Sequence, residues 1–237
     1  MDLIKEAVSK AEKVFLKYNV NIPDWNNYRC DSLLMNIVYQ ESIFTEGFRL
    51  NDDLCGMLIV DEYEKTIVYN DTHSPERRNF TIGHELGHYF LHLEKKSQFE
   101  DRSKNMLDNT INEFEMQANT FASHLILPDI VIITMLGNGL HYFQIKNRVK
   151  ISDTALYWRL VNYLMGNCAL NRISAKKIVD EFRDLSIASI ENITHHKNAF
   201  IYSKILNKTN IERLAKLFDN AIFIRSLLEE TFTIKDS

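Results

Sequence analysis

Glycine and proline are scarce in this sequence, which holds 7 Gly and 3 Pro among its 237 residues. Hairpins and tight turns depend on these two residues, so the sequence disfavours an all-β fold and favours long helices with short connections. A chain of this length can bury a substantial core, either as one large domain or as two small ones. The hydrophobic fraction of 45% and the charged fraction of 25% are typical of globular proteins and indicate neither disorder nor a fibrous repeat.

Charge and cysteine usage narrow the functional classes. A formal net charge of −4 argues against wholesale wrapping of nucleic acid, although it permits a local basic patch. The 3 cysteines are widely spaced and form no CxxC pair, so we expect neither a disulfide framework nor a thiolate zinc site. The first residues lack the basic and apolar regions of a signal peptide, and no run reaches the ~18 apolar residues of a membrane span. We therefore expect a cytoplasmic protein without a membrane segment.

The first part of the sequence combines helical and strand patterns. Apolar residues at helical spacing predict an amphipathic helix over 2–18, and Asp31 is placed to cap a second helix. Residues 42–55 fit neither pattern clearly. The short runs 57–60 and 66–69 are rich in β-branched residues and are separated by a polar stretch, which predicts a β-hairpin.

Two further helices are indicated by their termini. The segment 74–76 supplies a capping Ser, a Pro for the first helical position and an acid for the first turn, so a helix should begin there. The polar stretch 95–108 predicts a surface loop. Residues 110–113 fit a capping box that opens another helix, which Pro128 should end. From residue 129 onward the pattern is helical.

The helix that begins at Ser74 carries the sequence His84-Glu85-Leu86-Gly87-His88. Two histidines four residues apart lie on one face of a helix, one turn from each other. Both imidazoles can then reach a single Zn²⁺ at about 2.0–2.1 Å. Glu85 lies about 100° round the helix from His84, where its carboxylate can act as general base on the attacking water. The motif predicts a zinc hydrolase.

A catalytic zinc site needs a third protein ligand and one open position. The metzincin class would continue the motif with Gly at position 91 and His at position 94. This chain has Leu91 and Glu94 instead, which excludes that class. The gluzincin class takes its third ligand from a glutamate on a second helix, and this is the alternative that we pursue.

Four glutamates follow the motif closely enough to be weighed as the third ligand: Glu94, Glu100, Glu113 and Glu115. Glu94 continues the first helix and faces away from the histidines. Glu100 falls in the predicted loop, and Glu113 is engaged in the predicted capping box. Glu115 borders the buried face of its helix, and Asn119 follows one turn later as a hydrogen-bonding partner for a ligand. We therefore choose Glu115, with Asn119 as an outer contact.

Three more side chains lie near the motif: His92, His124 and Tyr89. His92 follows His88 by one turn and could donate to a ligand, stabilise the transition state or only line a polar rim. We expect His124 to lie at the surface or at the core edge, because it is nearly opposite Glu115 on its helix. Tyr89 points away from the two histidines on the helix, so we expect it to pack and not to bind an oxyanion.

Two stretches of the sequence, Arg77 to His92 (RRNFTIGHELGHYFLH) and Glu115 to Pro128 (EMQANTFASHLILP), resemble the two core motifs of the ImmA/IrrE family of metallopeptidases. The resemblance extends over residues 56–165. The departures are small and touch no ligand: Asn79 often is Arg in the family, Gly83 usually is Ala, and Ile126-Leu127 stands in a two-leucine position.

This resemblance implies a zincin-like catalytic domain in an α+β, mostly helical chain. It implies one Zn²⁺ bound by His84, His88 and Glu115, with Glu85 as catalytic base, in agreement with the choice made from helix spacing. Mn²⁺ or Fe²⁺ would also suit such a site of two nitrogens and one oxygen. It further implies an endopeptidase that cleaves a helix-turn-helix repressor and so acts as an anti-repressor. Some family members are instead stress-response regulators, so the alternative is a DNA- or protein-binding regulator with little or no peptidase activity.

The segment 145–160 resembles the helix-turn-helix-like unit of the same family, with Ser152 or Asp153 as the cap of its second helix. Between residues 139 and 172 basic side chains outnumber acidic ones: Lys146, Arg148, Lys150, Arg159 and Arg172 stand against Asp153 alone. Apolar residues are frequent there, so we expect a scaffold or substrate-docking role in preference to DNA binding. We accordingly expect a catalytic domain over 1–128, a helix-turn-helix-like unit over 129–166 and a helical segment over 167–237.

Overall fold

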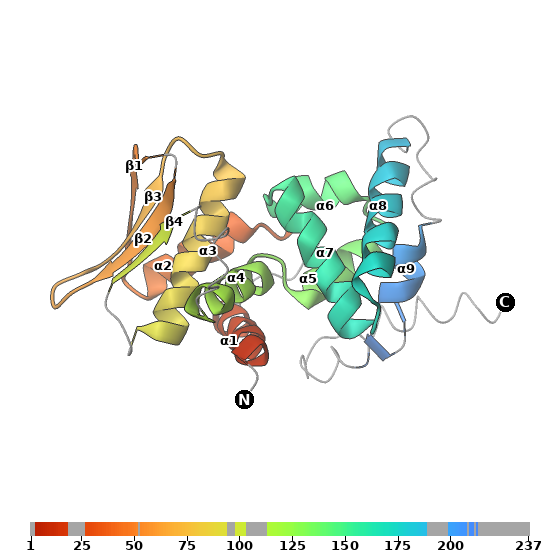
Figure 1. Cartoon of the computed structure of the whole chain (residues 1–237), viewed down its shortest axis with the longest axis horizontal. Helices are drawn as coiled ribbons and strands as arrows, with labels where there is room; N and C mark the ends of the chain where they lie inside the picture. The colour runs from red at the N-terminus through yellow and green to blue at the C-terminus, as the bar shows by residue number, and fades with distance from the viewer. Residues whose placement is uncertain are drawn as a thin grey trace. The chain divides into compact units, whose positions relative to one another are not determined.

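The computed structural model describes residues 3–18, 27–51, 53–93, 98–102, 113–188, 199–207, 209–210 and 212 (Figure 1). The chain divides into two compact units, and each is described by itself. The first comprises Met1–Ile22, Arg29–Pro128 and Val149–Ser152. The second comprises Pro23–Tyr28, Asp129–Arg148 and Asp153–Ser237.

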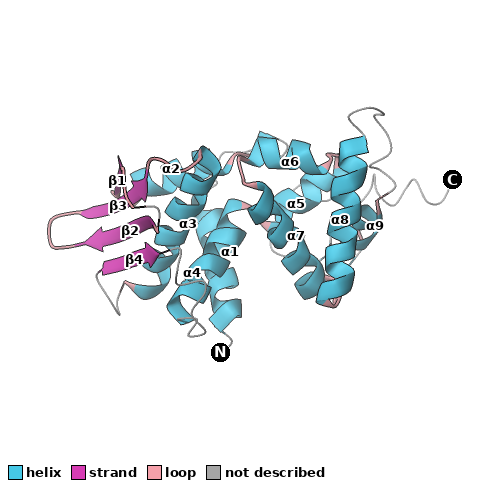
Figure 2. Ribbon diagram, turned by 45° about the horizontal axis from the view of Figure 1, so that its top comes forward, coloured by secondary structure: helices cyan, strands magenta, loops and turns pink. Residues whose placement is uncertain are grey.

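The first unit places four helices beside a small sheet (Figures 1 and 2). Its helices in the described residues are α1 (Leu3–Tyr18), α2 (Cys30–Gln40), α3 (Pro75–His92) and α4 (Glu113–Ile126). Its strands there are β1 (Phe44–Phe48), β2 (Leu54–Val60), β3 (Lys65–Asn70) and β4 (Gln98–Arg102). The strand order is β1-β3-β2-β4, with β1 parallel to β3 and the other pairs antiparallel. This confirms an α+β unit in which helices predominate.

Strands β2 and β3 form the predicted hairpin, with Leu58 paired to Ile67. The polar loop between them is organised by Asp61, whose carboxylate accepts hydrogen bonds from the backbone N–H of Tyr63 at 2.8 Å and of Glu64 at 2.9 Å. Both Leu58 and Ile67 are fully buried. Their burial marks the face of the sheet that packs on α3.

Two parts of the sheet differ from the sequence predictions. The stretch expected as a surface loop contains β4, which pairs with β2 from Ile59↔Gln98 to Leu54↔Arg102. The prediction was wrong because pairing with β2 satisfies the backbone, and polar residues are well tolerated on a strand at the edge of a sheet. The other edge strand, β1, lies in the stretch 42–55, which fits neither a helical nor a strand pattern clearly.

Helix α3 lies between the sheet and α4 (Figure 1). Its start is confirmed, because the Ser74 side chain accepts a hydrogen bond from the Arg77 backbone N–H at 3.3 Å and Pro75 occupies the first turn. The predicted amphipathic helix at the start of the chain is confirmed as α1, and it packs on α4 (Figure 2). Helix α4 begins at Glu113, and the proposed capping box reaches into residues 110–112, which lie outside the described residues. Helix α3 thus lies between the sheet on one side and α4 on the other.

The second unit is helical throughout the described residues. Its helices are α5 (Asp129–Gly137), α6 (Tyr142–Val149), α7 (Asp153–Asn167), α8 (Arg172–Ala188) and α9 (Phe200–Ile205). A buried ion pair joins Arg159 of α7 to Asp129 at the start of α5, with Nη2 and Oδ1 2.5 Å apart, and Asn167 donates to the other oxygen of Asp129 at 3.1 Å. The helical pattern predicted after residue 129 is confirmed for these elements, while residues 213–237 lie outside the description. The helix-turn-helix-like assignment and the three domain roles stay predictions.

One described stretch, Glu113–Gly137, is long and apolar enough to cross a membrane by composition alone. It comprises α4 and α5, and 78% of its most apolar window is buried inside the protein. Burial of this kind is typical of helices in the core of a folded domain.

Candidate metal centre

His84 and His88 lie one turn apart on the face of α3 that meets α4, and both side chains are almost completely buried. Their Nε2 atoms are 3.0 Å apart. The two rings meet edge to face, with their centroids 4.7 Å apart. The helical spacing therefore brings the two ring nitrogens to one point, as the motif predicted.

Glu115 reaches the same point from the first turn of α4. Its Oε2 lies 3.2 Å from Nε2 of His84, and its Oε1 lies 3.4 Å from Nε2 of His88. Two ligands bound to one tetrahedral zinc at ~2.0–2.1 Å lie about 3.4 Å from each other, so these separations fit a metal ion. The three side chains that converge in this way form the cluster expected from the sequence, although their role as ligands remains a prediction.

The other glutamates that were weighed as ligands are not part of this cluster in the described residues. Glu113 is exposed at the first residue of α4. The side chains of Glu94 and Glu100 lie outside the description. Glu115 is thus the glutamate that the structure brings to both histidines.

A close approach between α3 and α4 sets the distance between the two halves of the cluster. Gly87 lies between the histidines on α3, and a Cβ there would stand 2.9 Å from Cα and 3.1 Å from the carbonyl oxygen of Ala118 on α4. Ala118 is fully buried and follows Glu115 by three residues. The missing side chain at position 87 lets the backbones come close enough for Glu115 to reach the imidazoles.

The second nitrogen of each imidazole has a partner within hydrogen-bond distance. Nδ1 of His84 lies 3.0 Å from Oδ1 of Asn119, and Nδ1 of His88 lies 3.1 Å from Nδ1 of His92. Both outer residues are those named from the sequence. Contacts of this kind orient the imidazoles of metal sites and set which ring nitrogen carries the proton.

Sequence reasoning missed Gln117, which is buried beside this group. Its Oε1 lies 3.1 Å from Nε2 of His92. Gln117 follows Glu115 by two residues, a spacing that puts side chains on different faces of one helix. The contact arises because His92 extends one turn beyond His88, so only the packing of α3 on α4 reveals it.

Glu85 points to a different neighbour, strand β2. A Cβ on Gly56 would stand 3.6 Å from Oε1 of Glu85, and it would collide with Cγ2 of Thr81 at 2.4 Å and with the carbonyl oxygen of Val68 at 2.7 Å. The glycine therefore lets the strand lie directly on α3. Glu85 is fully buried as a result, next to His84 in sequence and shielded from bulk solvent.

The surroundings favour the protonation states that a metal site requires. Burial lowers the pKa of His88, the charges of His84 and His92 lower it further, and these effects outweigh Glu115, which raises it. Burial by itself raises the pKa of the Glu115 carboxyl, but contacts with His84 and His88 outweigh burial and hold that pKa well below its ordinary value. A neutral imidazole and an ionised carboxylate are the forms that bind a metal ion.

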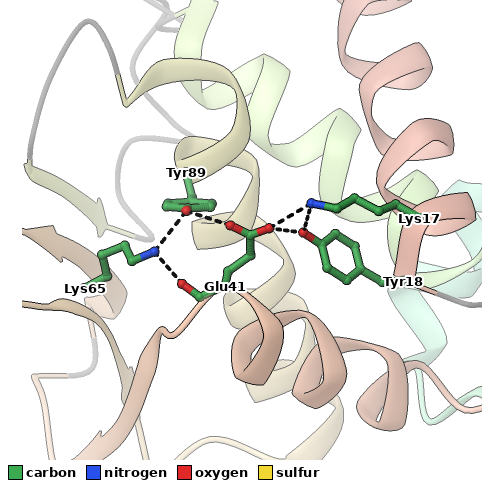
Figure 3. A network of polar contacts seen from close by, with 5 residues as sticks. All are labelled: Lys17, Tyr18, Glu41, Lys65 and Tyr89. Atoms are coloured by element: carbon green, nitrogen blue, oxygen red, sulfur yellow. Dashed lines mark hydrogen bonds and ion pairs between the residues drawn. The ribbon is translucent and has the colours of Figure 1, made fainter.

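Tyr89 is not part of the cluster and instead joins a polar network around Glu41, which Figure 3 shows. Its hydroxyl donates to Oε2 of Glu41 at 2.9 Å and accepts from Nζ of Lys65 at 3.2 Å. Glu41 also receives hydrogen bonds from Tyr18 and from Lys17 of α1. The expectation that Tyr89 packs instead of facing the site is confirmed, and the network ties α3 to α1, α2 and β3.

His124 and Arg159 also bear on the sequence predictions. Nδ1 of His124 lies 2.9 Å from the carbonyl oxygen of Thr120, one turn earlier on its own helix, and not at the cluster. Arg159 was counted among the basic residues of the segment 139–172, and this interpretation was wrong. Its guanidinium is 1% exposed and paired with Asp129, so it adds no charge to a surface.

Comparison with known proteins agrees with this geometry. The family model described as the IrrE N-terminal-like domain matches residues 45–161. The chain is 34% identical over 131 residues to the uncharacterized immunity region protein 2 of Bacillus phage phi105. The aligned region covers 55% of this chain and 72% of the phage protein. The chain is 34% identical over 113 residues to metallopeptidase ImmA of Bacillus subtilis (strain 168), which spans 46% of this chain and 62% of that protein. With the two motifs and the cluster that they form, these matches lead to one conclusion: the chain belongs to the ImmA/IrrE family of metallopeptidases.

Proposed function

We propose that this protein is a zinc-dependent endopeptidase that hydrolyses a peptide bond in a partner regulatory protein. The observation that carries the proposal is the convergence of three side chains: Nε2 of His84 lies 3.0 Å from Nε2 of His88, and the two carboxylate oxygens of Glu115 lie 3.2 Å and 3.4 Å from these two nitrogens. Two imidazoles and one glutamate form the ligand set of catalytic zinc sites that keep a fourth position for water or substrate. A structural zinc site would be closed and usually contains cysteine, and no cysteine belongs to this cluster.

Each residue then has a defined role. His84, His88 and Glu115 would hold the ion, which supplies a Lewis acid for the scissile carbonyl and makes water a stronger nucleophile near neutral pH. Glu85 would accept the proton of the attacking water on its carboxylate while the water oxygen bonds to the carbonyl carbon. The C–N bond then breaks, and Glu85 returns the proton to the leaving nitrogen. Because Glu85 is fully buried, few bulk water molecules compete for that proton.

The proposed substrate class follows from the family and from its relatives. The phage relative is named for an immunity region and the other is named as metallopeptidase ImmA. These names support a regulatory protein as substrate, and we propose a helix-turn-helix repressor encoded near the gene, whose cleavage would give the protein an anti-repressor role. Such a repressor binds DNA inside the cell, so the reaction would take place in the cytoplasm. Zn²⁺ is the proposed ion, and Mn²⁺ or Fe²⁺ could occupy the same ligand set.

Cleavage of a co-expressed partner tests the proposal. The protein is produced together with the helix-turn-helix protein encoded beside it, fragments are identified by mass, and the metal content of the purified protein is measured. Glu85→Gln should retain about one zinc per chain and lose cleavage, because a carboxamide does not take up the proton. Glu115→Gln should lose metal as well as cleavage. Glu113→Gln is the matched control, since Glu113 is exposed on the same helix outside the cluster.

Two results would contradict the proposal. Cleavage by Glu85→Gln at the wild-type rate would remove Glu85 from the mechanism. An intact partner, together with salt-dependent binding of the protein to duplex DNA, would favour the alternative of a DNA-binding regulator with little peptidase activity.

A further inference from the structure

A chain of polar contacts connects the candidate metal centre to the first turn of α1. Nδ1 of His88 lies 3.1 Å from Nδ1 of His92, and Nε2 of His92 lies 3.1 Å from Oε1 of Gln117. Nε2 of Gln117 donates to the carbonyl oxygen of Leu3 at 3.4 Å and lies 3.5 Å from Oε2 of Glu6. His88, His92 and Gln117 are all buried.

The far end of this chain determines which way the Gln117 amide faces. The carbonyl of Leu3 and the carboxylate of Glu6 only accept hydrogen bonds, so the NH₂ group of Gln117 must face α1. The amide oxygen of Gln117 then faces Nε2 of His92. With the amide reversed, its oxygen would face the Leu3 carbonyl and the Glu6 carboxylate, which cannot donate. Its NH₂ group would then face Nε2 of His92.

The amide in turn determines the protons on both rings. An amide oxygen accepts, so the ring proton of His92 lies on Nε2 and its Nδ1 is an acceptor. Nδ1 of His88 faces that acceptor and must carry the proton. A neutral imidazole has one ring proton, so Nε2 of His88 keeps a lone pair for an ion that would bind between it, Nε2 of His84 and Glu115.

We infer that Gln117 and His92 are positioning residues, which hold the ring proton of His88 on Nδ1 and so keep Nε2 ready to bind the metal ion. The first turn of α1 supplies the acceptors that orient Gln117. The other imidazole, His84, contacts Asn119 directly, with Nδ1 3.0 Å from Oδ1. The inference rests on the proposed function, because it concerns the metal site on which that function depends.

Two variants at Gln117 and one control variant, all in the full chain, test this relay, by which we mean the chain of contacts from Leu3 and Glu6 through Gln117 and His92 to His88. Zinc affinity is measured by competition with a chromophoric chelator. Gln117→Leu keeps the bulk but removes the acceptor for His92, and we expect zinc to bind about tenfold more weakly. Gln117→Glu keeps an acceptor for His92 while placing a carboxylate beside Glu6 and the Leu3 carbonyl. It should bind zinc like the wild type and yet unfold at lower urea concentration. A residue with only a packing role would not separate affinity from stability in this way.

Ser186→Ala serves as the control for general loss of stability. The Ser186 hydroxyl is fully buried in the second unit, where it accepts from the Tyr142 backbone N–H at 3.0 Å and donates to the Phe182 carbonyl at 2.6 Å. Its removal should destabilise the fold and leave zinc affinity unchanged. Nitrogen-15 spectra of the histidine rings in the zinc-loaded protein supply a direct readout: His92 should carry its proton on Nε2 in the wild type, and should lose this preference in Gln117→Leu.

The outcomes separate this inference from the proposed function. If the wild type binds no zinc at the cluster, the proposed function fails. If the wild type binds zinc and Gln117→Leu binds it equally well, or if the proton of His92 lies on Nδ1 in the wild type, the relay alone is overturned.

Discussion

Replacement of Gly87 by alanine should open the metal centre without removing a ligand. The added Cβ would stand 2.9 Å from Cα of Ala118, whereas carbon atoms in contact prefer ~3.5–4.0 Å. The neighbour is backbone, which cannot rotate away, so α3 and α4 must separate by about half an ångström or more. Glu115 is carried by the same stretch of α4 and would move with Ala118, away from His84 and His88.

The expected magnitudes follow from two opposing effects. Overpacking of a tight contact costs about 1–3 kcal/mol. Alanine is favoured over glycine in a helix interior by about 1 kcal/mol, which offsets part of this cost. The metal-free fold of Gly87→Ala should therefore lose roughly 0–2 kcal/mol. Zinc affinity should fall by about tenfold or more, equivalent to ~1.4 kcal/mol, because the displacement takes the Glu115 carboxylate away from an ion held by His84 and His88.

Gly83→Ala is the matched comparison, one turn earlier on the same helix. A Cβ at Gly83 meets the end of the Ile126 side chain, with Cδ1 at 3.1 Å, and lies 3.6 Å from Cβ of Ala122. The Ile126 side chain can shift, so this variant should keep its zinc affinity and gain up to about 1 kcal/mol of stability from helix propensity. Urea unfolding of the metal-free proteins and chelator competition measure the two quantities. Equal zinc affinity in Gly87→Ala and the wild type would refute the argument that this contact sets the geometry of the site.

Two further predictions concern parts of the fold away from the cluster. Arg159→Met leaves the buried carboxylate of Asp129 without its guanidinium, so the free energy of unfolding in urea should fall by about 3–5 kcal/mol. The double variant with Asp129→Leu should recover much of this loss. Equal stability of the single and the double variant would contradict the pairing. For Glu41, burial acts to raise the pKa, but hydrogen bonds from Tyr89 and Lys17 outweigh burial and hold it below its ordinary value of 4.5. The ionised carboxylate therefore stabilises the fold at neutral pH, and this contribution disappears as the pH falls through the folded-state pKa. Glu41→Gln should be less stable than the wild type at pH 7, and the difference should shrink in acid; a difference that stays constant down to pH 3 would count against it.

Local patterns accounted for the parts of the structure that depend on neighbours in sequence. The start of α3 follows from Ser74 and Pro75, and the meeting of His84 with His88 follows from helical spacing. Glu115 could be chosen because Asn119, one turn later, offered a partner for an imidazole, and the structure places that partner 3.0 Å from His84.

The features that escaped prediction depend on pairs distant in sequence. Strand β4 is formed by pairing with β2, and its polar residues carry no pattern from which a strand could be predicted. The burial of Arg159 follows from Asp129, 30 residues earlier, which a count of charges does not register. Gln117 touches His92 across two helices, and Gly56 matters only because α3 presses on β2. Packing between elements, rather than periodicity within them, decides these cases.

The contact between Gln117 and Leu3 has a consequence for how the protein is made. It joins residues 114 positions apart, and Glu115 lies in the same turn of α4. During synthesis α1 and α3 leave the ribosome before α4, and α3 carries two of the three proposed ligands. The cluster cannot be completed until α4, which carries Glu115, has also left the ribosome. Contacts of such long sequence separation form late in folding. A nascent or truncated chain that ends before α4 lacks the Glu115 carboxylate and should therefore bind metal poorly.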